Sequence, residues 1–300
     1  MKRFEIVRNR RWFFLLSGTI TVAGLLVMLL FGLNLGTDFK AGTRIQINLN
    51  TSFSSTDIRK LFQSEGYSIG QDAITSAGTV NQTAIIRLSN TISASQEAKL
   101  NQAIKAKYPH AAGAEIDTVD PIVARDLSRN AIYAVLLSSL GIVIYVAIRF
   151  EFRFAIAGII ALLHDAFIVI SVFTLLRLEV DLTFIAAVLT IVGYSINDTI
   201  VIFDRIRENL KLTKVKTVED LENLVNGSLW QTMTRSINTV MTVLFAALML
   251  FLFGGVSIHN FCFALIVGLI SGAYSSIFIA SPIWVAWRAR SLKVQKAAKS

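Results

Sequence analysis

The sequence has little charge, one cysteine, three prolines and three histidines. Charged residues make up 16% of the 300 residues and hydrophobic residues 54%, whereas a typical soluble domain carries about 25% charge. The single cysteine, Cys262, cannot form an intrachain disulfide, and its place in an apolar run predicts a buried, inert thiol. The composition therefore argues against a soluble domain and indicates a protein that crosses a membrane several times.

Apolar runs of about 20 residues, the length that a helix needs to cross a bilayer, occur six times. They lie at Phe13–Leu33, Ala131–Ile148, Phe154–Leu176, Leu182–Phe203, Ile237–Phe253 and Phe261–Trp287. No small-residue cleavage pattern follows the first run, so we expect an uncleaved signal anchor. The sequence predicts a polytopic α-helical membrane protein with six transmembrane helices.

The net charge of +9 reflects where the basic residues stand. Of the 29 Lys and Arg residues, 18 lie before the first run, between the second and third, between the fourth and fifth, and after the sixth. The short connections on the other side contribute only Arg177. Because basic residues gather on the cytoplasmic side of membrane proteins, we expect both termini to be cytoplasmic, and the charge indicates no nucleic-acid partner.

The long polar segment after the first run has the pattern of a folded domain. Alternating apolar residues predict strands at 43–50, 83–89 and 114–120 and a weak strand near Asp72–Ala77, and capping residues predict helices at 54–66 and 93–108. The order β-α-β-β-α-β predicts a small α+β ferredoxin-like extracytoplasmic domain between helices 1 and 2. The segment contains no cysteine framework and no cluster of metal ligands. We therefore expect it to be a spacer, a binding domain or a mechanical coupler.

These patterns divide the chain into four parts. The predicted parts are a cytoplasmic N-terminus with transmembrane helix 1 at 1–33, the extracytoplasmic α+β domain at 34–130, transmembrane helices 2–6 at 131–287 with a cytoplasmic loop at 204–235, and a basic cytoplasmic tail at 288–300. Two short linkers, 34–42 and 120–130, are expected to join the domain to the membrane helices. Within the loop, the amphipathic stretch 221–230 is expected to lie along the membrane surface.

Asp198 is the most informative polar residue in the apolar runs. A carboxylate inside a membrane-length helix costs about 2.5 to 3.5 kcal/mol on insertion scales, so it needs a partner or a function. It follows Asn197 and shares a helical face with Ser195, and Arg235 begins the fifth run on the same side. Either Arg235 extends to the headgroups and Asp198 makes a structural polar contact, or Asp198 exchanges a proton and Arg235 controls its charge.

Asp165 and His164 stand near the middle of the third run. Asp165 is expected either to make a packing contact with His164 or a helix backbone, or to serve as a relay partner. No nucleophile-base pair, cluster of metal ligands or glycine-rich phosphate loop accompanies these residues. We therefore expect no enzymatic catalysis, no metal and no cofactor.

Four motifs together resemble a known family. They are GTDFKAGT at 36–43, ALLHDAF at 161–167, GYSINDTIVIFDRIREN at 193–209 and QTMTRSINT at 231–239. In this order they are similar to the SecF branch of the SecD/SecF family of bacterial protein-export membrane proteins, in the resistance-nodulation-division superfamily. The first motif departs from the family pattern at Ala41, where a glycine is common.

The resemblance implies a function driven by the proton motive force. The resemblance implies that the chain works with SecD and YajC beside the SecYEG channel, on preproteins in a bacterial inner or plasma membrane, among membrane lipids. The family's proton-transport residues fall on Asp198 and Arg235, and we expect a proton relay of these two with Asn197, Ser195 and Asp165. The alternatives are a proton-driven exporter of lipids or small molecules from the same superfamily and a non-transporting translocon scaffold.

Overall fold

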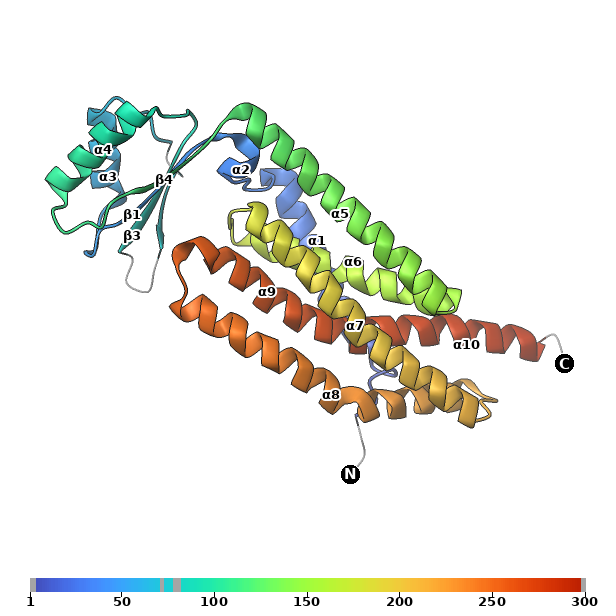
Figure 1. Cartoon of the computed structure of the whole chain (residues 1–300). Helices are drawn as coiled ribbons and strands as arrows, with labels where there is room; N and C mark the ends of the chain where they lie inside the picture. Colours follow the sequence, from blue (N-terminus) through green and yellow to red (C-terminus); the bar gives the residue numbers. More distant parts are fainter. Residues whose placement is uncertain (1–3, 71–72, 78–81, 298–300) are drawn as a thin grey trace.

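The computed structural model describes residues 4–70, 73–77 and 82–297 and has two parts, a helical bundle and a small α/β domain at one end of it (Figure 1). Within the described residues, six helices are long and apolar enough to cross a membrane. This confirms the predicted fold class. The weak strand predicted from Asp72 begins at Ile74, and Asp72 itself and the last three residues of the basic tail lie outside the described residues.

The bundle is made of α1 and α5 to α10. Their bounds are α1 Arg10–Phe31, α5 Pro121–Arg149, α6 Phe152–Leu175, α7 Leu182–Leu212, α8 Val218–Phe253, α9 Val256–Ser275, a π-helical turn η1 Ser276–Ala280, and α10 Ser281–Ala297. The sixth span is thus α9, η1 and α10 together. Both termini lie at the end of the bundle away from the domain (Figure 1).

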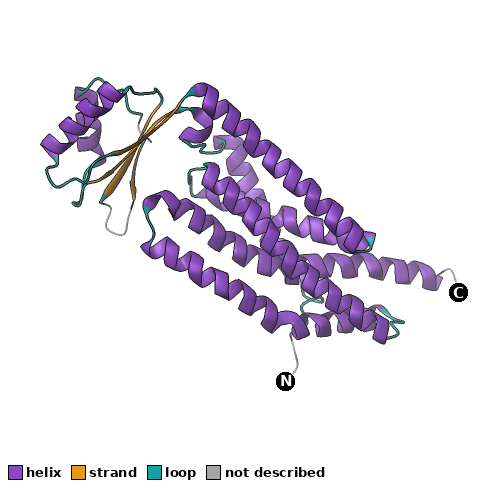
Figure 2. Cartoon of the chain, in the orientation of Figure 1, coloured by secondary structure: helices purple, strands orange, loops and turns teal. Residues whose placement is uncertain are grey.

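Among its described residues the domain has four strands and two principal helices, and the strands form one sheet beside the helices (Figure 2). They are β1 Gly42–Asn48, α3 Ser55–Ser64, β2 Ile74–Ala77, β3 Thr83–Leu88, α4 Ala94–Lys107 and β4 Glu115–Val119. The strand order β2-β3-β1-β4, with every pairing antiparallel, matches the predicted ferredoxin-like arrangement. Alternate residues of β1, such as Ile45 and Ile47, are buried with Phe62 of α3 and Leu100 of α4, which explains the alternating pattern of the sequence.

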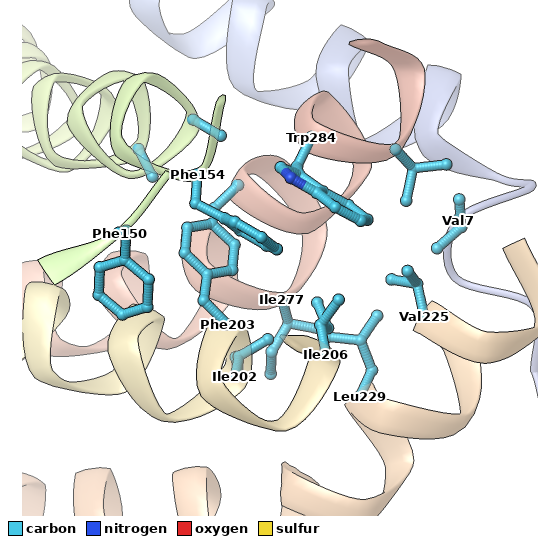
Figure 3. Packing of buried hydrophobic residues seen from close by; sticks show 14 of the residues in the cluster. Val7, Phe150, Phe154, Ile202, Phe203, Ile206, Val225, Leu229, Ile277 and Trp284 are labelled. Carbon is cyan, nitrogen blue, oxygen red and sulfur yellow. The ribbon is translucent and has the colours of Figure 1, made fainter. Parts of the chain in front are cut away.

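Helices α6, α7 and α9 form the centre of the bundle. Small residues let them approach closely: a Cβ at Gly268 would overlap Ile191 of α7, and one at Gly272 would lie 3.2 Å from the Cβ of Ser195. Near the end that carries the termini, Phe154 and Trp284 belong to an apolar cluster contributed by α6, α7, α8 and α10 (Figure 3). These contacts fix the rotation of α7 against its neighbours.

Several helices continue beyond the apolar runs that predicted them. Helix α5 begins at Pro121, a favoured first helical residue, so the predicted linker 120–130 is helical apart from Asp120. Helices α7 and α8 also run through most of the predicted loop 204–235, leaving only 213–217 between them, and the amphipathic stretch 221–230 is part of α8. Hydropathy detects the apolar length of a helix, whereas its ends are set by capping groups such as the Thr217 capping box.

The other predicted linker, 34–42, is fixed to the bundle. It contains the short helix α2 Thr37–Lys40. The backbone of Val180, between α6 and α7, accepts from Gly36 N and donates to Asn34 O, each at 2.9 Å. Nearby, Arg87 of β3 donates to Glu179 across 2.6 Å. The domain is therefore held against the bundle by backbone and ion-pair contacts as well as by the chain.

Ala41 occupies a backbone conformation that suits glycine. Its φ of 62° and ψ of 170° lie in a region that is essentially restricted to glycine and that costs other residues about 1 to 3 kcal/mol. The turn that leads into β1 thus has a backbone geometry that favours glycine, although an alanine stands there. Its Cβ makes this position a site of stored strain.

Replacing Ala41 by glycine should therefore stabilise the protein by about 1 kcal/mol, because relief of the strain exceeds the added chain entropy. Thermal unfolding in detergent should show a higher midpoint. The matched control is Ala98→Gly at an exposed position in the interior of α4, where glycine costs about 1 kcal/mol. A lowered midpoint for Ala41→Gly would contradict the strain.

Candidate functional site

The carboxylate of Asp165 lies at the centre of a fully buried polar cluster. It is 0% exposed. Ser195 of α7 donates to its Oδ2 at 2.5 Å, Ser275 of α9 donates to the same oxygen at 2.7 Å, and Ser271 of α9 donates to Oδ1 at 2.7 Å. His164 Nδ1 lies 3.1 Å from Oδ1. Both carboxylate oxygens are satisfied, so this group is arranged to hold α6, α7 and α9 together.

Helical spacing and the π-helical turn explain how the serines reach their partners. Ser271 and Ser275 are four residues apart and share one face of α9. The following turn is η1, so the next residue, Ser276, meets a different helix: its hydroxyl lies 2.8 Å from that of Thr199 on α7. Successive serines thereby connect the sixth span to both α6 and α7. Such π-helical turns are frequent at functional sites.

Asp198 lies one helical turn from Ser195 but in a different environment. Its side chain is buried, with 8% of the residue exposed. Its Oδ2 has no hydrogen-bond partner in the described part of the chain, and neither has the hydroxyl of Ser236. The Ser236 hydroxyl, on α8, lies close to this carboxylate without reaching hydrogen-bond geometry, and the charge of Arg235 on the same helix also acts on it. An unsatisfied buried polar group costs about 1 to 3 kcal/mol, so Asp198 is poised to gain a proton or a partner.

A narrow cavity adjoins Asp198 between α7, α8 and α9. Tyr194, Thr239 and Gly272 are among its lining residues. Its water-accessible space of about 10 Å³ is enough for about one water molecule. Asn197, like Tyr194 and Arg235, is exposed at the surface of the single chain. The carboxylate thus lies just beneath a surface that carries an arginine.

The predicted site residues separate into two groups. Ser195 was expected on the same helical face as Asp198, but its hydroxyl donates a hydrogen bond to Asp165. Arg235 and Asp198 lie near one another, as the matching depths of their helices indicate. Sequence reasoning missed the donors Ser271 and Ser275, and Ser236 beside Asp198, because serines in apolar helices are common. The four-residue spacing of Ser271 and Ser275 is the signal that could have found two of them.

The described residues contain no group of three or more His, Cys, Asp and Glu side chains that could hold a metal ion. Around Asp165 the other groups are serine hydroxyls and one imidazole. This arrangement can orient a carboxylate and join three helices around it.

Two family models match the chain. One, described as protein export membrane protein SecD/SecF, C-terminal, covers residues 99–290, and the other, the SecD/SecF GG motif, covers residues 27–52. The second match includes the strained turn at Ala41.

Curated relatives and solved structures agree with these models. Protein translocase subunit SecF of Alicyclobacillus acidocaldarius is 59% identical over 97% of this chain and 95% of that protein. Protein translocase subunit SecDF of Bacillus subtilis is 46% identical over 99% of this chain and 40% of that longer protein.

The crystal structure of SecDF from Thermus thermophilus, titled a translocon-associated membrane protein, matches with a TM-score of 0.86 at 35% identity, covering 95% of this chain and 39% of that one. A second structure, of SecDF in a super-membrane-facing form, matches with a TM-score of 0.70 at 33% identity, covering 100% of this chain and 40% of that one. The chain is a multi-pass membrane protein and belongs to the SecD/SecF family of protein-export membrane proteins.

Proposed function

We propose that this chain is a SecF-type subunit of the Sec protein-export machinery and uses the proton motive force, together with a SecD partner, to promote late extracytoplasmic steps of preprotein translocation through SecYEG. The observation that carries the proposal is the buried Asp198 carboxylate, with an unpaired oxygen and Arg235 nearby, in a chain of this family. Its work requires proton movement and no catalytic chemistry or cofactor of its own.

The proposed orientation places both termini in the cytoplasm of a bacterial cell, with the α/β domain outside the inner or plasma membrane. The concentration of basic residues at the end of the bundle that carries the termini supports it. In this arrangement the predicted parts 1–33, 34–130, 131–287 and 288–300 keep their proposed roles, except that 121–130 is the first part of α5. The segment 204–235 is a pair of helix ends joined by a short turn.

Within the proposed relay the two aspartates have different roles. Asp198 takes up and releases the proton, because its Oδ2 has no hydrogen-bond donor among the described residues to hold it in one state. Asp165 and Ser195 position α7, because their hydrogen bond joins α6 to the turn before Asp198. Arg235 changes the charge balance at Asp198, and Asn197 lies beside the carboxylate on the exposed face.

The proposed partner covers this exposed face. Asn197, Tyr194 and Arg235 are exposed in the single chain, although an ionisable group at membrane depth ordinarily faces protein or water rather than lipid. A SecD subunit seated there would complete the surroundings of Asp198. SecYEG, YajC and preproteins are further proposed partners, and nucleic acid is not.

The proposed output is movement of the α/β domain. Only Asp120 separates β4 from α5, and its side chain caps α5 by accepting from Ile122 N at 2.8 Å. A displacement of α5 would therefore pass directly to the sheet. The lower TM-score to the super-membrane-facing SecDF structure, at nearly the same identity, supports more than one arrangement of this fold.

Asp198→Asn should abolish gradient-dependent stimulation of export while leaving the protein folded, because the amide keeps the shape and cannot titrate. Export into membrane vesicles, with and without an imposed proton gradient, measures the effect. Asp165→Asn is the contrasting variant: it should lower stability by about 1.5 to 3 kcal/mol, since it weakens hydrogen bonds to a charged group. Full stimulation in Asp198→Asn would contradict the relay and favour a scaffold.

Arg235→Lys should also lose most of the gradient-dependent stimulation. A planar guanidinium and a compact ammonium present different donors and different fields to the carboxylate. The matched control is Arg205→Lys, since Arg205 is half-buried and pairs with Glu208 on its own helix at 2.9 Å. Equal export by both lysine variants would indicate that Arg235 only reaches toward the headgroups.

Reversing one charge of the Arg87–Glu179 pair should release the domain from the bundle. In Arg87→Glu the two carboxylates repel, and the double variant Arg87→Glu with Glu179→Arg restores the attraction. Spin labels on cysteines introduced at Gln96 and Ser257, with Cys262 replaced by alanine, should report a broader distance distribution only in the single variant.

The control for this experiment is Arg129→Glu, which breaks an exposed pair within α5. Identical distance distributions in Arg87→Glu and in the protein with the unaltered Arg87–Glu179 pair would show that this ion pair does not hold the domain.

A further inference from the structure

A basic pocket lies at the end of the bundle that carries the termini, about 14 Å along α7 from Asp198. Its volume is about 320 Å³, and it is bordered by the turn before α6, the end of α7 and the side of α10. Three cations line it, Arg207, Lys211 and Arg288, together with one carboxylate, Glu151. The pocket is separate from the proposed relay and has no role in it.

The pocket has an apolar floor. Phe154 and Trp284 line it, and their rings stack with centroids 4.4 Å apart and an interplanar angle of 13°. Both side chains are buried in the apolar cluster of Figure 3. Because both rings are almost wholly buried, they form a fixed base beneath the pocket and expose little surface to it, and the positive charges lie at its rim.

The three cations differ in whether they have an ion-pair partner. Arg207 pairs with Asp204 at 3.0 Å and lies over the ring of Phe150, 5.7 Å from its centroid. Lys211 and Arg288 are exposed, and among the residues that the structure describes neither has an ion-pair partner. One carboxylate, Glu151, cannot neutralise these charges, so the rim attracts an anion.

The depth of the pocket matches the headgroup layer. Phe203 is the last residue of the apolar run in α7, and at 1.5 Å per residue Arg207 and Lys211 lie about 6 and 12 Å beyond it. The headgroup layer extends roughly 5 to 8 Å beyond the hydrocarbon on each side, and Lys side chains reach back toward it. Phe152 and Trp287, in edge contact at 6.0 Å, provide the aromatic belt that is typical of this level.

We propose that this pocket binds the headgroup of an anionic phospholipid, with its phosphate between Lys211, Arg288 and Arg207. Arginine forks and lysine ammonium groups are the usual phosphate donors in proteins. The pocket lies at headgroup depth beside the aromatic pair Phe152 and Trp287, which favours a lipid headgroup over a free phosphate. Basic pockets between membrane helices bind lipid headgroups in this way.

The test measures retention of phosphatidylglycerol by the purified full chain in detergent, using native mass spectrometry and thermal unfolding. Phosphatidylcholine with the same acyl chains and inorganic phosphate are the comparison ligands. Each interfacial cation contributes about fivefold to affinity, so Lys211→Gln with Arg288→Gln should weaken phosphatidylglycerol binding about 30-fold. The matched control is Lys214→Gln with Arg290→Gln, which removes two exposed charges nearby that do not line the pocket.

The expected result is selective retention of phosphatidylglycerol by the unaltered chain and by the control variant, and loss of that retention in the pocket variant. The site would be overturned if phosphatidylcholine bound as well as phosphatidylglycerol. It would also be overturned if the control variant lost phosphatidylglycerol to the same extent as the pocket variant. Equal stabilisation by inorganic phosphate would overturn the assignment to a lipid. Mass spectrometry reports binding directly, so a change in stability of the variant does not obscure the outcome.

Discussion

A carboxylate buried among apolar helices is the constraint on which the bundle depends. Asp165 is 0% exposed, and its charge is tolerable because Ser195, Ser271 and Ser275 donate to it from two neighbouring helices. Hydrogen bonds to a charged group contribute about 1.5 to 3 kcal/mol each. They form only if α7 and α9 present these faces to α6, so one side chain sets the rotation of three central helices.

The same rotation of α7 places the carboxylate of Asp198 where one of its oxygens has no hydrogen-bond partner among the described residues. One turn beyond Ser195 the carboxylate turns toward α8, where Arg235 acts on it but its Oδ2 has no hydrogen-bond partner in the described residues. Asp165 is fully hydrogen-bonded, and its bond to Ser195 fixes α7 one turn before Asp198. Asp165 therefore keeps the incompletely hydrogen-bonded Asp198 in position. A change in the charge of Asp198 would alter its interactions with α8 without dissolving the centre of the bundle.

Local sequence patterns predicted the elements, whereas the contacts between them required the structure. The alternation that buries Ile45 and Ile47 identified β1, and the order of such segments predicted the ferredoxin-like domain. Helix continuity through Pro121 and past Thr217 was missed, because caps and not hydropathy end a helix. The partner of Ser195 was also missed, since a helical face can be assigned from spacing but the helix that it meets depends on tertiary packing.

In the proposed relay, Asp198 is the group that takes up and releases the proton. Infrared difference spectroscopy of the protein in lipid, recorded between two pH values, detects the carbonyl stretch of a carboxylic acid directly. The account predicts a pH-dependent carboxyl band that is absent in Asp198→Asn and retained in Asp165→Asn. A band that disappears with Asp165→Asn and persists in Asp198→Asn would contradict it.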